Sequence, residues 1–304
     1  MPSKSDSILS HPWQTNFRGK LSFLTDKHTW AKVFGSRADQ SDVDGVSGFT
    51  ANTWGMVLGA DAELNSDTRL GLAFAYAKTN ATGNADLFGT HQYADVDAYH
   101  LIAYGSKALG NDIELKLQMD FGQNINHGER NIQFGGLGRT ANSSYRSDIA
   151  HIGGTLEKTL ELSPAVTITP RLRADYVWIH DHTYSETGAS ALNLNVDSNT
   201  TEAFVLGGGA KLGYAIGEHS KLVVDLDAGY DTINQQSSIT AIYAGVPGQA
   251  FATKGISHSP WLMHGGIAYV TAYSERLEFT VRYDIEGRSN FTNQSAAAKL
   301  RWSF

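Results

Sequence analysis

The sequence predicts an all-β fold, a twelve-stranded antiparallel β-barrel that spans an outer membrane, with an N-terminal α-helix inside the pore. Three observations predict it: short segments alternate between apolar and polar residues, their number is even, and the connections between them alternate between short and long. The chain also lacks any run approaching the roughly 20 apolar residues that a membrane-spanning helix needs. A helical membrane protein is therefore excluded.

The clearest alternation lies in residues 277–286, where apolar residues such as Leu277 and Phe279 alternate with polar ones such as Arg282 and Asp284. Successive side chains of a strand point to opposite faces, so a repeat of two residues gives one apolar face and one charged face. In a membrane barrel the apolar face contacts lipid and the charged face lines a hydrated lumen.

The same pattern predicts the other strands and the connections between them. Strands are expected near 30–37, 54–63, 68–79, 95–107, 112–124, 146–160, 166–179, 201–215, 221–232, 258–272, 276–287 and 294–304. Inward and outward faces are ambiguous in 30–37, 95–107 and 258–272. Long connections rich in Gly, Asn, Ser and Thr are expected near 38–53, 80–94, 125–145, 180–200 and 233–257, with a shorter one near 288–293.

Two strands carry small residues on their second face. These strands are residues 70–77 and 204–214, and the second of them contains Gly207 and Gly209. Glycine in a strand often marks a close approach by another group, so we expect these faces to leave room for something large in the pore. The residues expected to line the pore are Arg171, Arg173, Gly207, Gly209, Asp225, Asp227, Glu278, Arg282 and Asp284.

Composition excludes several classes of protein. The 304 residues contain no cysteine, which rules out disulfide scaffolds and thiolate metal sites and is compatible with an oxidising periplasm. A net charge of −7 argues against a nucleic-acid partner. Residues 1–7 lack the apolar core of a secretory signal, so we expect either that the signal was removed or that the chain is a fragment of a longer precursor.

A soluble β-sandwich is the alternative fold for a chain with such strands. It would place charged residues on the outside and would not show long connections alternating with short ones. The barrel accounts for both features and is therefore preferred.

The N-terminal segment is expected to hold a helix near residues 12–26. Ser10 would cap it and Pro12 would occupy its first position. Trp13 and Phe17 begin an apolar stripe at helical spacing that continues through Leu21 and Leu24. A helix about 10–12 Å wide would fit inside a barrel of this size.

Several motifs follow one another in an order that is typical of a known family. They are the expected leading helix, T-W-A-K-V-F-G at 29–35, W-G-M-V-L-G-A-D at 54–61, the hairpin 66–76, and a last strand ending on Phe304. Together they resemble the translocator domain of classical autotransporters, the type V secretion proteins. The resemblance implies a linker with a pore helix over 1–28 and a transmembrane translocator barrel over 29–304. It also implies an N-terminal passenger, absent here, that the domain exports to the cell surface of a Gram-negative bacterium.

The resemblance further implies partners and a C-terminal signal. The partners are outer-membrane lipid, the barrel-assembly machinery and the passenger itself, and the domain is expected to be a monomer that binds no nucleic acid. The assembly machinery recognises the last strand of such barrels, which would place Leu300, Trp302 and Phe304 in its signal.

Catalysis is not expected, and neither is a metal or cofactor. Some members of the family cleave the passenger linker by cyclisation of an asparagine in the pore helix; the leader here lacks their Asn-Asn pair, and Asn16 is the candidate cleavage site. His180-Asp181-His182 is the best candidate for a metal site or for the dyad of a barrel phospholipase or protease. Neighbouring residues of an extended chain point to opposite faces, so His180 and Asp181 do not form a ligand pair. A porin-like channel is the other functional alternative.

Overall fold

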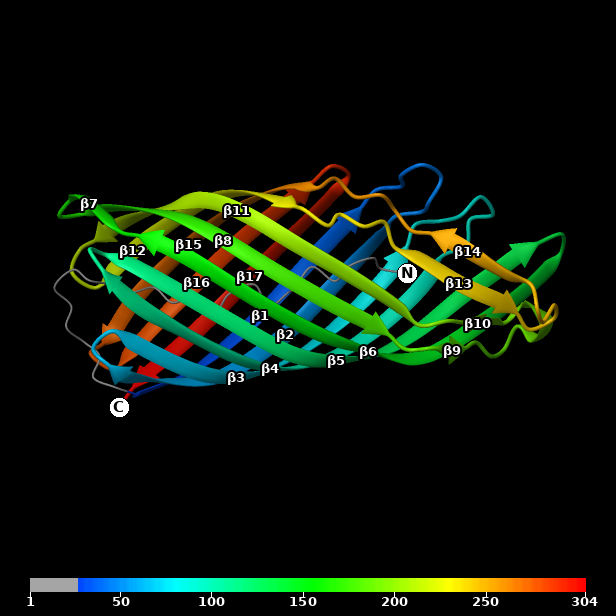
Figure 1. Ribbon diagram of the computed structural model, residues 1–304, viewed down its shortest axis with the longest axis horizontal. Helices are drawn as coiled ribbons and strands as arrows, with labels where there is room; N and C mark the ends of the chain where they lie inside the picture. Colours follow the sequence, from blue (N-terminus) through cyan, green and yellow to red (C-terminus); the bar gives the residue numbers. More distant parts are fainter. Residues whose placement is uncertain (1–26) are drawn as a thin grey trace.

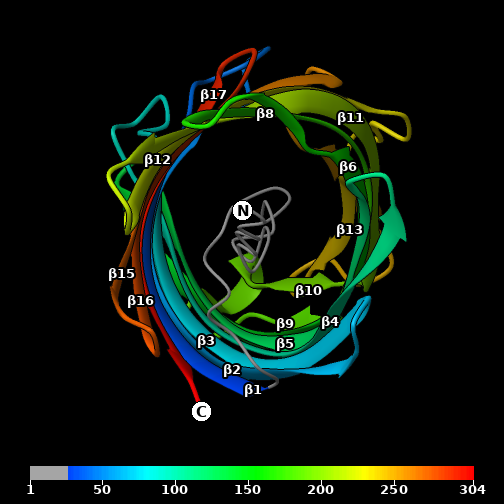
Figure 2. The ribbon, with the colours of Figure 1, turned by 90° about the vertical axis from the view of Figure 1, so that its left-hand side faces the viewer.

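Twelve strands close into a single antiparallel barrel in the computed structural model, which describes residues 27–304 (Figures 1 and 2). The barrel strands are β1 (Lys27–Gln40), β2 (Phe49–Asn65), β3 (Thr68–Gly83), β4 (Gln92–Gly110), β5 (Ile113–Phe134), β6 (Leu137–Lys158), β8 (Val166–Asp181), β11 (Asn199–Ile216), β12 (Ser220–Asp231), β15 (Trp261–Ser274), β16 (Leu277–Arg288) and β17 (Phe291–Ser303). All twelve predicted strands are confirmed. The expected helix at 12–26 and Asn16 lie outside the described residues.

The barrel closes between its first and last strands. β1 pairs with β17 in one uninterrupted register, from His28 opposite Ser303 to Gln40 opposite Phe291. Closure satisfies the backbone of both edge strands, which lipid could not do. Among residues 27–304, no helix is long and apolar enough to cross a bilayer.

The two ends of the barrel differ in their connections. One end, here called the short-turn end, carries tight turns, for example between β2 and β3, and includes both the start of β1 and the C-terminal Phe304 (Figure 1). The short β7 (Leu160–Ser163) continues β6 into the turn before β8 at this end. The opposite end, here called the long-loop end, carries the connections 41–48, 84–91, 182–198 and 232–260.

The prediction of a loop over 125–145 is wrong. β5 and β6 continue as a hairpin to Phe134 and Leu137, turning at Gly135-Gly136, where both residues have positive φ. Such a two-residue turn needs glycine or a similar residue at both positions. The hairpin extends beyond the other strands at the long-loop end (Figure 1). Both faces of this hairpin contact water, so its residues do not alternate between apolar and polar, and its sequence resembles that of a loop.

Two of the predicted long connections contain a second sheet. It has four strands, in the order β14 (Ala250–Lys254), β13 (Ser238–Tyr243), β10 (Leu194–Val196) and β9 (Tyr184–Ser185). A short 3₁₀ helix, Ser190–Leu192, precedes β10. The sheet lies at the long-loop end (Figure 1) and is held to the β5–β6 hairpin by Arg130, whose guanidinium donates to both carboxylate oxygens of Glu186 at 2.9 and 2.6 Å.

The outside of the barrel is apolar along the middle of the strands. Large hydrophobic side chains such as Leu72, Phe121, Leu172 and Leu226 are exposed there. Aromatic side chains mark both limits of this belt, with Trp54, Tyr76, Tyr99, Trp178, Tyr230 and Trp261 toward the long loops and Tyr214, Tyr273, Trp302 and Phe304 toward the short turns. This is the outward surface of a membrane barrel, where aromatic rings lie at the two interfaces.

Candidate functional site: the barrel lumen

Charged side chains line the lumen because the strands alternate their faces. Along β12, for example, Asp225, Asp227 and Asp231 are buried, whereas Leu226 between them is exposed on the outside. Buried charged groups are costly unless they are paired and hydrogen-bonded. Most of the buried acids and bases of the described lumen wall form connected ion-pair networks.

The largest network joins β8, β12, β15 and β16 across the lumen wall. Asp225 accepts hydrogen bonds from Arg171 and Arg282, both at 2.9 Å. Arg171 also donates through Nε to Asp227 at 2.6 Å, and Arg282 donates to Asp284. Each of the three carboxylates therefore accepts a hydrogen bond from at least one of the two arginines.

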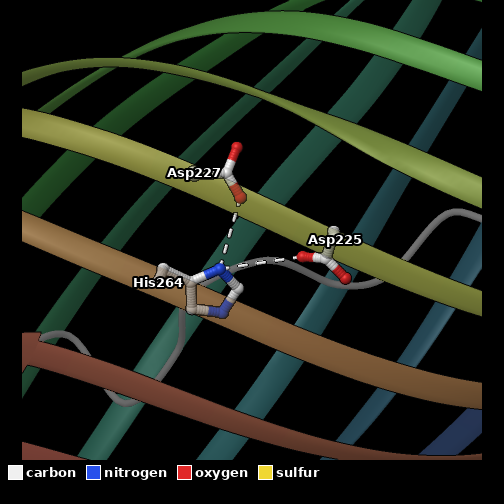
Figure 3. Close-up of side chains that lie close together, drawn as sticks. All are labelled: Asp225, Asp227 and His264. Atoms are coloured by element: carbon white, nitrogen blue, oxygen red, sulfur yellow. Dashed lines mark hydrogen bonds and ion pairs between the residues drawn. The ribbon is translucent and has the colours of Figure 1, made fainter.

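His264 joins the same network from β15 (Figure 3). Its Nδ1 lies 3.3 Å from Asp227 and 3.7 Å from Asp225, and its Nε2 lies 3.0 Å from Asp284. Asp225, Asp227 and His264 are close enough together to hold a metal ion. The two guanidiniums of Arg171 and Arg282 already supply the positive charge that a metal would bring, so the cluster is best described as an ion-pair network.

A second network continues around the wall from β4 to β8. His151 of β6 lies between two carboxylates, with Nδ1 2.7 Å from Asp120 and Nε2 3.4 Å from Asp175. His100 also contacts Asp120, and Arg173 donates to Asp175 at 2.7 Å. Nearer the short turns, Glu157 is paired with Lys211 at 2.8 Å and with Lys116. Residues of both networks line one cavity, among them His151, Arg173, His264 and Arg282.

A third network spans the closure between β1 and β17 at the short-turn end. Asp61 of β2 accepts hydrogen bonds from Arg69 of β3 at 2.6 Å and from Arg301 of β17 at 3.2 Å. His28 of β1 contacts the same carboxylate at 3.1 Å, and Tyr104 of β4 donates to it at 2.9 Å. One carboxylate thus connects five strands, including the first and the last.

The lumen wall formed by β1 to β4 is apolar over part of its height. Trp30, Phe34, Val57, Ala75 and Ile102 form a buried cluster there. The indole Nε1 of Trp30 donates to the Tyr104 hydroxyl at 2.5 Å, which links this apolar wall to the third network. The lumen therefore has an apolar side facing a charged side.

The aromatic rings of this wall lie against glycines of the neighbouring strand. Trp30 covers Gly59, and a Cβ at Gly59 would meet the indole at 2.4 Å. Phe34 covers Gly55 and Tyr104 covers Gly71 in the same way, each from the directly paired position. These glycines let a flat ring lie on the strand beside it.

The residues predicted to line the pore all lie on inward faces. Arg171, Arg173, Asp225, Asp227, Arg282 and Asp284 meet in the networks described above. Glu278 lies on the same face of β16, where its charge interacts with those of Lys221 and Lys299. Gly207 and Gly209 do not leave open space, because the side chains of Arg173 and Asp227 lie over them.

Two other predicted groups have outward-facing side chains, apart from Asp181. Leu300, Trp302 and Phe304 point outward and are exposed on the last strand. His180 and His182 lie at the outer end of β8, whereas Asp181 turns inward and accepts a hydrogen bond from Ser147 at 2.5 Å. His180 and Asp181 therefore point to opposite faces of the strand.

Sequence reasoning missed the histidines that connect the networks. His264 lies in the strand predicted at 258–272, whose facing the sequence left ambiguous, and His151 lies in the strand predicted at 146–160. A signal was available for His151, because Thr155 and Glu157 lie on its face of the strand whereas Ile152 and Leu156 lie on the other. Their carboxylate partners lie on the barrel strands directly before and after each histidine, and the register that brings each pair together cannot be read from either strand alone.

Comparison with known proteins identifies relatives of this barrel. A family model described as the autotransporter β-domain matches residues 29–284. An extracellular serine protease of Serratia marcescens is 28% identical over 184 residues, covering 60% of this chain, and outer membrane protein A of Rickettsia conorii is 26% identical over 288 residues, covering 90%. The chain spans 17% and 14% of the length of these two relatives.

Solved structures share the fold. The translocator domain of the autotransporter NalP from Neisseria meningitidis superposes with a TM-score of 0.76 at 16% identity, covering 92% of this chain and 89% of that one. The β-domain of the Bordetella autotransporter BrkA gives 0.62 at 17% identity, covering 91% and 99%.

Proposed function

Because the chain belongs to the autotransporter β-domain family, we propose that its lumen is the route by which an N-terminal passenger reaches the surface of a Gram-negative bacterium. The domain itself is an autotransporter translocator barrel of the outer membrane. The passenger and its route through the lumen are the parts of this function that we propose.

The position of β1 carries the proposal. Lys27 begins β1 at the short-turn end, where Phe304 donates its backbone N–H to the Lys27 carbonyl at 3.2 Å. Short turns of membrane barrels face the periplasm and long loops face the outside. Any chain that precedes Lys27 therefore starts at the periplasmic mouth and has the lumen as its direct path outward.

The chemistry of the lumen suits the passage of an unfolded chain. Moving unpaired backbone polar groups through hydrocarbon costs several kcal/mol each, and a hydrated, charged lumen removes most of that cost. Folding of the passenger outside the cell supplies direction without a nucleotide. The translocator does no covalent chemistry in this account.

A porin-like channel is the competing function, and conductance separates the two. We propose that the linker, expected over 1–28, ends where β1 begins at Lys27 and that its helix closes the pore after export. The refolded chain should then be mostly closed in a planar bilayer, and a chain beginning at Lys27, which keeps all of β1, should conduct far more. Equal conductance would favour a simple porin.

Assembly is proposed to depend on the last strand. Leu300, Trp302 and Phe304 present an exposed apolar face that the barrel-assembly machinery would recognise before lipid covers it. We propose that the assembled domain is a monomer in outer-membrane lipid and binds no nucleic acid. Trp302→Ala should lower the amount of folded barrel in cells, while refolding of the purified variant in detergent changes less.

Two chemical activities are tested separately. We propose that the linker is not cleaved inside the barrel and that the refolded chain stays whole. Cleavage at Asn16 would split the chain near that residue, and intact mass measurement would detect the fragments. Turnover of a phospholipid or peptide that disappears in His180→Ala would instead establish a barrel enzyme.

A further inference from the structure

Two histidines and a carboxylate meet on the outer surface of the barrel, just beyond the aromatic belt at the long-loop end. His180 lies near the end of β8, His182 follows it, and Asp148 lies on the neighbouring β6. The Nε2 atom of His182 is 2.8 Å from Asp148 Oδ2. Both side chains are open to solvent, with exposed fractions of 49% and 41%.

The two imidazoles lie close enough together for one metal ion to reach both once their rings turn toward it. Their ring centroids are 5.3 Å apart and the rings are inclined by 78°. A tetrahedral zinc ion bonded to nitrogen at about 2.0–2.1 Å would hold two such centroids about 5.2 Å apart. The centroid separation is therefore suitable, but the ligand atoms of His180, His182 and Asp148 do not all lie within 4.8 Å of one another, so the imidazoles must turn before one ion can bind all three.

Neighbouring groups already orient two of the three ligands. The Nδ1 of His180 bonds to Thr200 Oγ1 at 2.9 Å, and its ring stacks on Trp178 at 5.7 Å, which leaves Nε2 as the ligand atom. Gln123 donates to Asp148 Oδ1 at 3.0 Å and leaves Oδ2 toward His182. A hydrogen bond to the second nitrogen of a histidine and to a ligating carboxylate is the usual support of a metal site.

The acid that completes this site is not the one next to the histidines in sequence. Asp181 points inward, whereas His180 and His182 are two residues apart and share the outward face. Asp148 is the cross-strand partner of His180. Barrel closure thus supplies a carboxylate that the sequence alone does not place there.

The lumen cluster of Asp225, Asp227 and His264 is the less suitable site. Arg171 and Arg282 donate to its carboxylates, so an incoming metal would have to displace two buried guanidiniums. At the outer cluster the described contacts of Asp148 come from the neutral Gln123 and from His182.

We propose that Asp148, His180 and His182 form a binding site for a divalent transition metal, Zn²⁺ being the best fit, that is open to the cell exterior. Two imidazoles and one carboxylate with a water in the fourth position are a common zinc ligand set. Binding requires the His182–Asp148 separation to open from 2.8 Å to about 3.4 Å, as a tetrahedral ion would set it, and the His180 ring to turn so that its Nε2 faces the other two ligands. The ion would fix the start of the 182–198 connection to β6.

Metal titration of the full refolded chain, without a histidine tag and stripped of metal, tests the site. Co²⁺ should bind at one site per chain with the visible absorption of tetrahedral coordination, and Zn²⁺ should displace it. His182→Gln and Asp148→Asn should each weaken binding at least about tenfold. The matched control is His127→Gln, an exposed histidine of β5 outside the cluster, which should bind as the parent does.

A second readout uses Trp178, which stacks on His180. Cu²⁺ should quench part of the tryptophan fluorescence in the parent and less in Trp178→Phe, provided that each variant shows the heat-dependent gel shift of a folded barrel. Absence of saturable Co²⁺ binding by the parent would overturn the site. Equal affinities of the parent and His182→Gln would do so as well.

Discussion

Asp225 illustrates how single residues hold the lumen wall together. It is almost fully buried, and it accepts hydrogen bonds from the arginines of two strands, Arg171 on β8 and Arg282 on β16. Removing the carboxylate would leave both guanidiniums short of a partner in a buried site. Breaking a buried ion pair on one side costs far more than the intact pair contributes.

We therefore expect Asp225→Ala to lower the free energy of unfolding of the refolded barrel by about 3 kcal/mol. Asp39→Ala is the matched control, because its partner Arg37 and Asp39 itself are both exposed, and exposed pairs contribute less than about 1 kcal/mol. Urea titration in detergent or lipid measures both. Similar losses in the two variants would contradict the assigned role of Asp225.

Asp86 organises the tip of the 84–91 connection outside the membrane. Hydrogen bonds from the Thr90 hydroxyl and from the backbone N–H groups of Thr90 and Phe88 lower the pKa of its carboxyl below the ordinary value. A lowered pKa in the folded state means that these bonds add stability above about pH 4, the ordinary range of the group, and lose it as pH falls through the lowered pKa.

Asp86→Ala should therefore loosen the connection at neutral pH and speed cleavage by chymotrypsin beside the exposed Phe88. The parent should resist chymotrypsin at the same pH, and the barrel strands should stay uncleaved in both the parent and the variant. If cleavage rates at Phe88 were the same, the carboxylate would not be what holds the turn.

At the scale of elements, the pairing of aromatic rings with glycines shapes the β1–β4 wall. Gly59→Ala would drive a methyl group into the Trp30 indole, and overpacking of this kind typically costs about 1–3 kcal/mol. Gly138→Ala on the β6 side of the long hairpin meets nothing within 4 Å and should be neutral or slightly stabilising. Denaturation midpoints compare the two, and a loss in the second as large as in the first would contradict the packing argument.

Elements inside the membrane were predictable from sequence, and those outside it were not. Residues 277–286 predict a strand because one face contacts lipid and the other contacts water, so apolar and polar residues alternate. Residues 125–145 form strand as well, but water on both sides removes the alternation, and the β9–β10–β13–β14 sheet was missed for the same reason. The lumen-facing position of residues such as Asp225 was predicted correctly. The contact between Asp61 and Arg301 was not predictable, because these residues are 240 positions apart and meet only when the barrel closes.

In the whole molecule, the closed barrel combines three properties on which the proposed function depends. Its outside is apolar with aromatic limits, its lumen carries charges that are paired in networks, and its first strand starts at the short-turn end. The first property is that of an outer-membrane barrel, and under the proposed function the other two would give a preceding chain a polar path toward the long loops.

The most direct test of this path is export of a reporter fused before Met1 of the full chain, behind a secretory signal, in Gram-negative cells. The heat-dependent gel shift would first establish that the barrel is folded in the outer membrane. Protease added to intact cells should remove the reporter while the barrel remains. A reporter that stays protected in the periplasm beside a fully folded barrel would contradict it.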